Sequence, residues 1–138
     1  MDQPAFVELL NEDLETEFRS IVQYIQHVAT IKGADMLSTI DELRKHVSQE
    51  VQHALILAEQ VDFLGGTPTT KVPAVPSETD TQAALRLDLE LETTQLQRYR
   101  DRFAQAQEMG LADVAEALRP LLEQTQEHVR DLQTILGI

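Results

Sequence analysis

The sequence predicts an all-α protein, an antiparallel four-helix bundle with a long crossover between the second and third helices. Four long segments are rich in the helix-forming residues Leu, Ala, Glu, Gln and Arg, and glycine and proline are confined to the breaks between them. Apolar residues recur in each segment at alternating spacings of three and four, which is the pattern of helices in a bundle. The segments span about residues 3–32, 36–64, 79–109 and 111–136, and together they predict a single domain over residues 1–138.

Composition limits the chemistry of the chain. With 138 residues and 42% hydrophobic residues, it can bury a core without cross-links. The absence of cysteine excludes disulfides, thiol nucleophiles and thiolate metal sites. The net charge of −13 argues against nucleic acid and anionic membranes as partners and favours cations as ligands. The first residues have no basic and apolar leader pattern and no stretch has the length of a membrane span, so we expect a soluble cytoplasmic protein.

The first two segments form an antiparallel pair because only a short turn joins them. Gly33 can adopt the left-handed conformation that ends a helix, and Gly110 can do the same after the third segment. Asp35 or Ser38 is expected to cap the second helix.

The connection between the two pairs is long and proline-rich, over residues 65–78, which lets the third helix begin at the far end of the bundle. Ser77 and Asp80 resemble a capping box at its start. Pro120 lies inside the fourth segment and removes the hydrogen bond to the Glu116 carbonyl, which predicts a kink.

Each apolar stripe is interrupted near its middle by polar residues. A single glutamate on such a stripe usually reaches water from the flank of the helix. Interruptions at similar depth on all four segments favour another interpretation, in which the side chains share a divalent cation that neutralises their buried charge. The interrupting residues are Glu17, Glu50 with His53, Glu92, and Thr125 with His128.

Several motifs resemble those of bacterioferritin and the wider ferritin-like superfamily. The stretch Leu14–Tyr24 is similar to the family's first helix, in which a ligand glutamate precedes a tyrosine by seven residues. Glu50-Val51-Gln52-His53 resembles its first Glu-x-x-His motif. The turn at residues 63–68 and the segment 87–92 are also similar.

The resemblance implies a ferritin-like bundle that binds two iron ions and oxidises Fe(II) with O2 or peroxide. Tyr24 is then a candidate for electron supply or for a hydrogen bond to a ligand, and simple core packing is an equal alternative. The metal ligands implied are Glu17, Glu50, His53, Glu92 and His128.

Three departures from the family pattern stand out. Thr125 occupies the position of the second bridging glutamate, and neighbouring Glu123 or Glu127 can replace it only if the helix is distorted. Val51 stands where haem-binding bacterioferritins carry methionine, so no haem is predicted. The chain stops at Ile138 without the short fifth helix of the large shells, so a homodimer is expected.

Other residues and functions stay open. His46 is either an exposed helix residue, a support for the ligands or an accessory metal ligand, whereas His27 is expected at the surface. Arg98, Arg100 and Arg102 are expected to form solvated ion pairs. A dimanganese centre that disproportionates peroxide is one alternative function. A non-catalytic dimeric module with a degenerate site, suggested by Thr125, is another.

Overall fold

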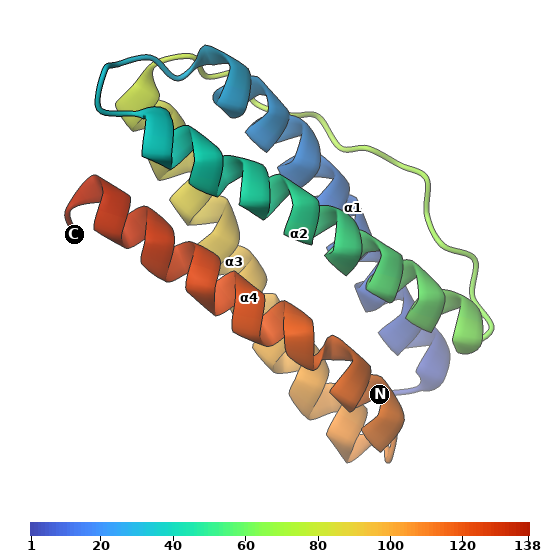
Figure 1. Ribbon diagram of the computed structural model, residues 1–138. Helices are drawn as coiled ribbons and strands as arrows, with labels where there is room; N and C mark the ends of the chain where they lie inside the picture. The colour runs from blue at the N-terminus through green and yellow to red at the C-terminus, as the bar shows by residue number, and fades with distance from the viewer.

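The structure is a computed structural model that describes all residues 1–138, and it confirms the four-helix bundle. The helices are α1 (Gln3–Thr30), α2 (Leu37–Phe63), α3 (Thr81–Glu108) and α4 (Ala112–Leu136), with no strands. The closest helix pairs are α1 with α2 and α3 with α4, and the contacts of α1 with α3 and of α2 with α4 complete the bundle (Figure 1). No helix combines the length and apolar character needed to cross a membrane.

Local capping follows the sequence only in part. The Asp80 carboxylate accepts the Ala83 amide at the start of α3, at 3.0 Å, and Gly110 has the expected positive φ of 75°. The predicted cap of α2 is wrong, because Met36 takes the N-cap position and no side chain caps the helix there. The Ser77 hydroxyl instead accepts a hydrogen bond from Gln26 at 2.7 Å. Tertiary contact with α1 therefore replaces the predicted capping box.

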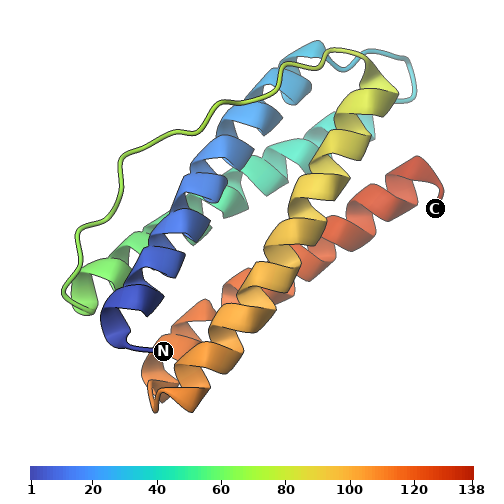
Figure 2. The same cartoon turned by 180° about the vertical axis from the view of Figure 1, so that it is seen from behind.

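The crossover between α2 and α3 runs along the outside of α1 for the length of the bundle (Figure 2). At one end, the Asn11 side chain donates to the Thr67 carbonyl at 3.1 Å and accepts from the Thr69 amide at 3.0 Å. At the other end, Gln26 accepts the Glu78 amide at 3.1 Å. These polar contacts fix the path of the crossover, so α3 starts beside the end of α1.

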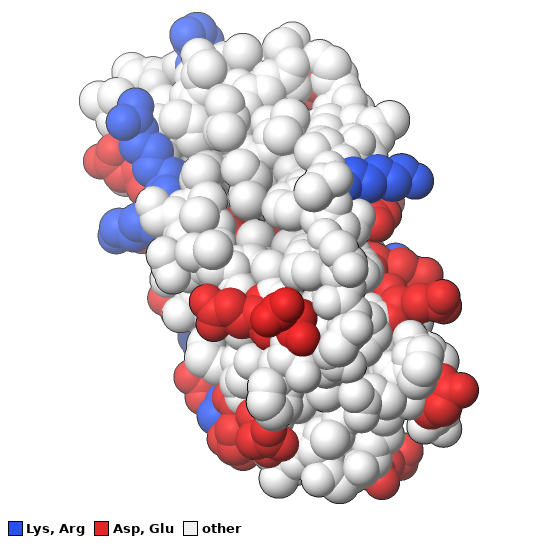
Figure 3. Space-filling model, turned by 90° about the vertical axis from the view of Figure 1, so that its right-hand side faces the viewer, with Lys and Arg blue, Asp and Glu red and all other residues white.

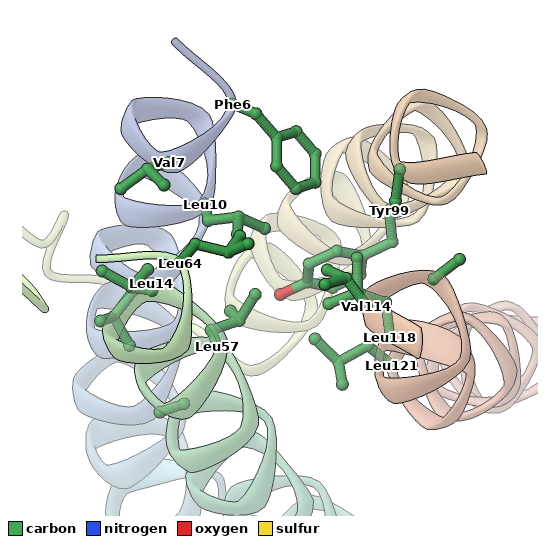
Figure 4. Packing of buried hydrophobic residues seen from close by; sticks show 14 residues of the cluster. Phe6, Val7, Leu10, Leu14, Leu57, Leu64, Tyr99, Val114, Leu118 and Leu121 are labelled. Atoms are coloured by element: carbon green, nitrogen blue, oxygen red, sulfur yellow. The ribbon is translucent and has the colours of Figure 1, made fainter. Parts of the chain in front are cut away.

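The apolar core is divided into two parts. A cluster of 14 buried residues fills the end that holds the start of α1, and Figure 4 shows Tyr99 among leucines such as Leu57 and Leu118, with its hydroxyl pointing into the bundle. Five buried residues, including Tyr24 and Leu132, form the cluster at the other end. The layer between the two clusters is polar, and this layer contains the candidate site.

The surface is acidic, as the composition requires. Asp and Glu side chains cover more of the face in Figure 3 than Lys and Arg do, consistent with the net charge of −13. Such a field raises the local concentration of cations around the bundle.

Candidate metal centre

The polar residues predicted from the interrupted stripes lie together in the middle of the bundle. Each helix contributes at least one, and none is more than 2% exposed. The structure therefore contradicts the interpretation of these glutamates as flank residues that reach water. The buried set consists of Glu17 from α1, Glu50 and His53 from α2, Glu92 from α3, and Thr125 and His128 from α4.

Glu50 is shared by two groups of possible metal ligands. The first group contains Glu17 and His53, the second contains Glu92 and His128, and the ligand atoms of each group lie within 4.8 Å of one another. His53 Nδ1 lies 3.5 Å from Oε2 of Glu50, and His128 Nδ1 lies 3.1 Å from the other oxygen, Oε1. One carboxylate thus faces both groups, which is the placement of a bridge between two metal ions.

A glutamine from the opposite helix orients each histidine. His53 Nε2 donates to Oε1 of Gln124 on α4 at 2.8 Å, and His128 Nε2 donates to Oε1 of Gln49 on α2. Because Nε2 of each ring is engaged in this way, Nδ1 faces the carboxylates. This is the arrangement in which an outer hydrogen bond fixes the metal-binding nitrogen of a histidine.

Two buried tyrosines hold the outer glutamates. The Tyr24 hydroxyl donates to Glu92 at 3.0 Å, and the Tyr99 hydroxyl donates to Glu17. Burial, together with the neighbouring carboxylates, raises the pKa of both phenols well above the ordinary value. Both hydroxyls therefore keep their protons. Residue spacing within one helix does not identify Tyr99 as a partner of Glu17.

Two further buried carboxylates accept hydrogen bonds across the contact between α1 and α3. Asp88 accepts from His27 Nδ1 at 2.8 Å, and Asp13 accepts from Arg102 at 2.8 Å. The predictions of a surface position for His27 and a solvated ion pair for Arg102 are wrong, because these residues are 0% and 6% exposed. The reason is that each reaches across the bundle to a buried carboxylate. Gln23 also donates to Asp88, and Arg98 also lies beside Asp13.

The sequence contains an internal repeat that relates the two helix pairs and the buried polar residues within them. Several residues of the first helix pair are followed 75 positions later, in the second pair, by a residue of the same type. Examples are Glu17 and Glu92, His53 and His128, and Tyr24 and Tyr99. The repeat also relates Gln49 to Gln124 and Asp13 to Asp88. It makes the hydrogen bonds reciprocal, since the tyrosine of each half bonds the glutamate of the other half.

The three central carboxyl groups differ in their pKa values. Burial and repulsion from Glu17 and Glu92 raise the pKa of Glu50 well above its ordinary value. Burial also opposes ionisation of Glu92, but interactions with His128 and Glu50 lower its pKa to about 2. The pKa of Glu17 is likewise lowered by Glu50 and His53 in spite of its burial. A cation-free centre therefore keeps a proton on Glu50 between two ionised glutamates.

Several buried polar atoms in this layer have no hydrogen-bond partner. They include Glu17 Oε2, His53 Nδ1 and Thr125 Oγ1. An unpaired carboxylate oxygen and an unpaired imidazole nitrogen in a dry interior are costly unless a cation coordinates them, so the donor set fits a dimetal centre. Thr125 supplies only a hydroxyl, and Glu123 and Glu127 are exposed on the outside of α4, so neither replaces the absent carboxylate.

Comparisons with known proteins agree with this geometry. The family model of the ferritin-like domain matches residues 7–138, and the chain belongs to this family. A crystal structure described as ferritin-like, diiron-carboxylate proteins from Bacillus anthracis str. Ames is 30% identical in sequence. It covers 99% of both chains with a TM-score of 0.92. A search of curated proteins gave no match. Together, the family, the fold and the clustered carboxylates and histidines support a dimetal protein.

Replacing Gln124 by Leu removes the acceptor for His53 Nε2 and frees the ring to rotate. We expect metal affinity at the centre to fall by about 10–100-fold, as is usual when the outer partner of a metal-binding histidine is lost. Competition of the protein with a chromophoric chelator for Zn²⁺ measures this change. Gln126→Leu, at an exposed position of the same helix, is the matched control. Equal affinity in both variants contradicts the assigned role of Gln124.

The raised pKa of Glu50 predicts a pH-dependent stability of the metal-free protein. A carboxyl group with a raised pKa in the folded state stabilises that state below its ordinary pKa of 4.5, and this contribution is lost as pH rises through the raised value. Glu50→Gln stays neutral, so the metal-free variant should exceed the wild type in stability at pH 8. The difference should shrink on acidification, by up to about 1.4 kcal/mol per pH unit.

Urea unfolding of both proteins between pH 4.5 and 8 tests this expectation. Glu59→Gln, at an exposed position of α2, controls for the change of net charge. A stability difference that does not vary with pH contradicts the proton assigned to Glu50.

Proposed function

We propose that this protein binds two iron ions in the centre described above and oxidises Fe(II) with O2 or peroxide. The observation that carries the proposal is the position of Glu50, which faces two separate groups that each pair a histidine with a glutamate. Two divalent ions bridged by one carboxylate are the arrangement expected of dimetal bundles. Oxygen donors from glutamate also stabilise the ferric state more than softer donors do.

Each residue has a distinct part in this proposal. Glu17 and His53 hold one ion, Glu92 and His128 hold the other, and Glu50 holds both. Bound iron would supply one electron from each ion to the oxidant. Since Tyr24 and Tyr99 donate hydrogen bonds to Glu92 and Glu17, they act as positioning residues that fix the carboxylates. The Thr125 hydroxyl leaves the second bridging position without a protein carboxylate, and an oxidant would bind the ions there.

The test is the addition of Fe(II) in air to metal-free protein, with the ferric absorbance followed against the iron added. We expect fast oxidation that saturates near two equivalents per chain. Glu50→Ala should abolish the fast phase because both ions lose a ligand. Glu59→Ala, on the exposed face of α2, should oxidise iron as the wild type does.

Oxidation no faster than in buffer contradicts the iron-oxidising function. In that case, rapid peroxide disproportionation by the manganese-loaded protein identifies the dimanganese alternative. Tight metal binding without either activity identifies a non-catalytic bundle.

The outer face of the α1–α2 pair supports a homodimer. Four apolar side chains on it are 40% or more exposed, namely Val22, Ile25, Val51 and Leu55. A largely apolar hollow of about 300 Å³ lies on the same face, between Phe18 and the crossover. An apolar surface of this kind is usually buried by a partner, and we propose that a second copy of the chain covers it. The cytoplasmic location stays a prediction.

Ile25→Asp places a charge in the middle of this face without touching the core. We expect the protein to shift from dimer to monomer in size-exclusion chromatography with light scattering, because burial of an unpaired carboxylate opposes association. Ile138→Asp, at an exposed apolar residue after the end of α4, should remain a dimer. A wild-type protein that is monomeric at all concentrations, or an Ile25→Asp variant that stays dimeric, contradicts the proposed interface.

A further inference from the structure

A second group of metal-binding side chains lies between α2 and α4, outside the dimetal centre. Glu42 and His46 come from α2 and Asp131 from α4, and their ligand atoms lie within 4.8 Å of one another. The imidazole of His46 is buried, with 1% exposed, whereas the Asp131 carboxylate is 31% exposed at the border with solvent. The group therefore joins one buried nitrogen to two carboxylates that water can reach.

Hydrogen bonds fix the orientation of the His46 ring. The Tyr24 hydroxyl, which donates a hydrogen bond to Glu92, lies 3.2 Å from His46 Nδ1. On the other side of the ring, His46 Nε2 forms a hydrogen bond with Asp131 Oδ2 at 3.2 Å. A cation bound between this nitrogen and this oxygen would take the place of the proton that they share.

The internal repeat distinguishes this group from the outer partners of the dimetal centre, although the His46 ring stacks on His128 with centroids 3.9 Å apart. The outer partners of that centre have polar counterparts 75 positions away, as Gln49 and Gln124 do. His46, by contrast, corresponds to Leu121, which is fully buried in the apolar core. The counterparts of Glu42 and Asp131 are also apolar, namely Ala117 and Ile56. Each of the three residues, two in the first helix pair and one in the second, thus has an apolar counterpart in the other pair, and all three meet at one place.

The group is also accessible to a hydrated ion. Asp131 lines a hollow of about 430 Å³ along α4 whose other lining residues are all polar. Glu42 forms one other contact, a hydrogen bond from Lys45 at 3.3 Å in which both side chains are exposed. Exposed pairs of this kind are weak and exchange readily for another cation.

We propose that His46 Nε2, Asp131 and Glu42 bind a third divalent transition-metal ion, separate from the dimetal centre. One imidazole nitrogen with two carboxylate oxygens suits Zn²⁺, Mn²⁺, Fe²⁺ and Co²⁺, and water from the open side completes the coordination. The Nδ1 hydrogen bond to Tyr24 is the outer contact that orients a ligating histidine. This proposal does not depend on the oxidation of iron.

Equilibrium dialysis of metal-free protein against Co²⁺, with visible spectra of the bound ion, tests the third site. We expect three ions per chain in the wild type and two in His46→Leu, which installs the residue found at the repeat-related position 121. Asp131→Asn changes a partly exposed side chain and should also bind two. Glu127→Gln, at another carboxylate lining the same hollow, should keep three.

A double variant, Glu50→Ala with His53→Ala, separates this proposal from the dimetal centre. One Co²⁺ ion should remain bound in that background and should be lost when His46→Leu is added. Retention of that ion supports the third site even if the dimetal centre fails. A double variant that binds no ion overturns the third site. Full Co²⁺ binding by both His46→Leu and Asp131→Asn overturns it as well.

Discussion

The rest of the structure depends on the repulsion among three carboxyl groups buried in the middle of the bundle. Glu17, Glu50 and Glu92 are each at most 2% exposed, and a buried charge without a partner destabilises a fold by several kcal/mol. Every polar contact around them counters this cost. Tyr24 and Tyr99 donate hydrogen bonds to the two outer glutamates, and in the absence of metal Glu50 keeps its own proton. A layer arranged in this way is stable enough to fold and gains most when cations enter.

The two apolar clusters determine where this layer lies and how rigid it is. They fill the ends of the bundle, on either side of the glutamates, so the bundle cannot relax by opening one end to water. The histidines are further restrained by glutamines from the facing helix. The first coordination groups are thus oriented before a metal binds, which lowers the ordering cost of binding.

The near-twofold repeat explains both the design of the centre and its asymmetry. Where the halves agree, as at Glu17 and Glu92, they supply one buried glutamate to each group of possible metal ligands. Where the halves differ, their chemistry differs too. Thr125 stands at the position that corresponds to Glu50, and His46 stands at the position that corresponds to Leu121. Both differences lie on α2 and α4. Activity toward small oxidants and cations is therefore expected on this side of the bundle.

The sequence by itself determined the four helices, their antiparallel order and the depth of the central polar residues. Helical periodicity is local, and a glutamate on an apolar stripe can be recognised without knowing its neighbours. Only the tertiary structure decided which polar groups meet across the bundle. The pairing of His27 with Asp88 and of Tyr99 with Glu17 depends on the relative rotation of α1 and α3. Residue spacing within one helix contains no information about this rotation. The same holds for the contact of His46 with Asp131, since their meeting requires α2 and α4 to pack side by side.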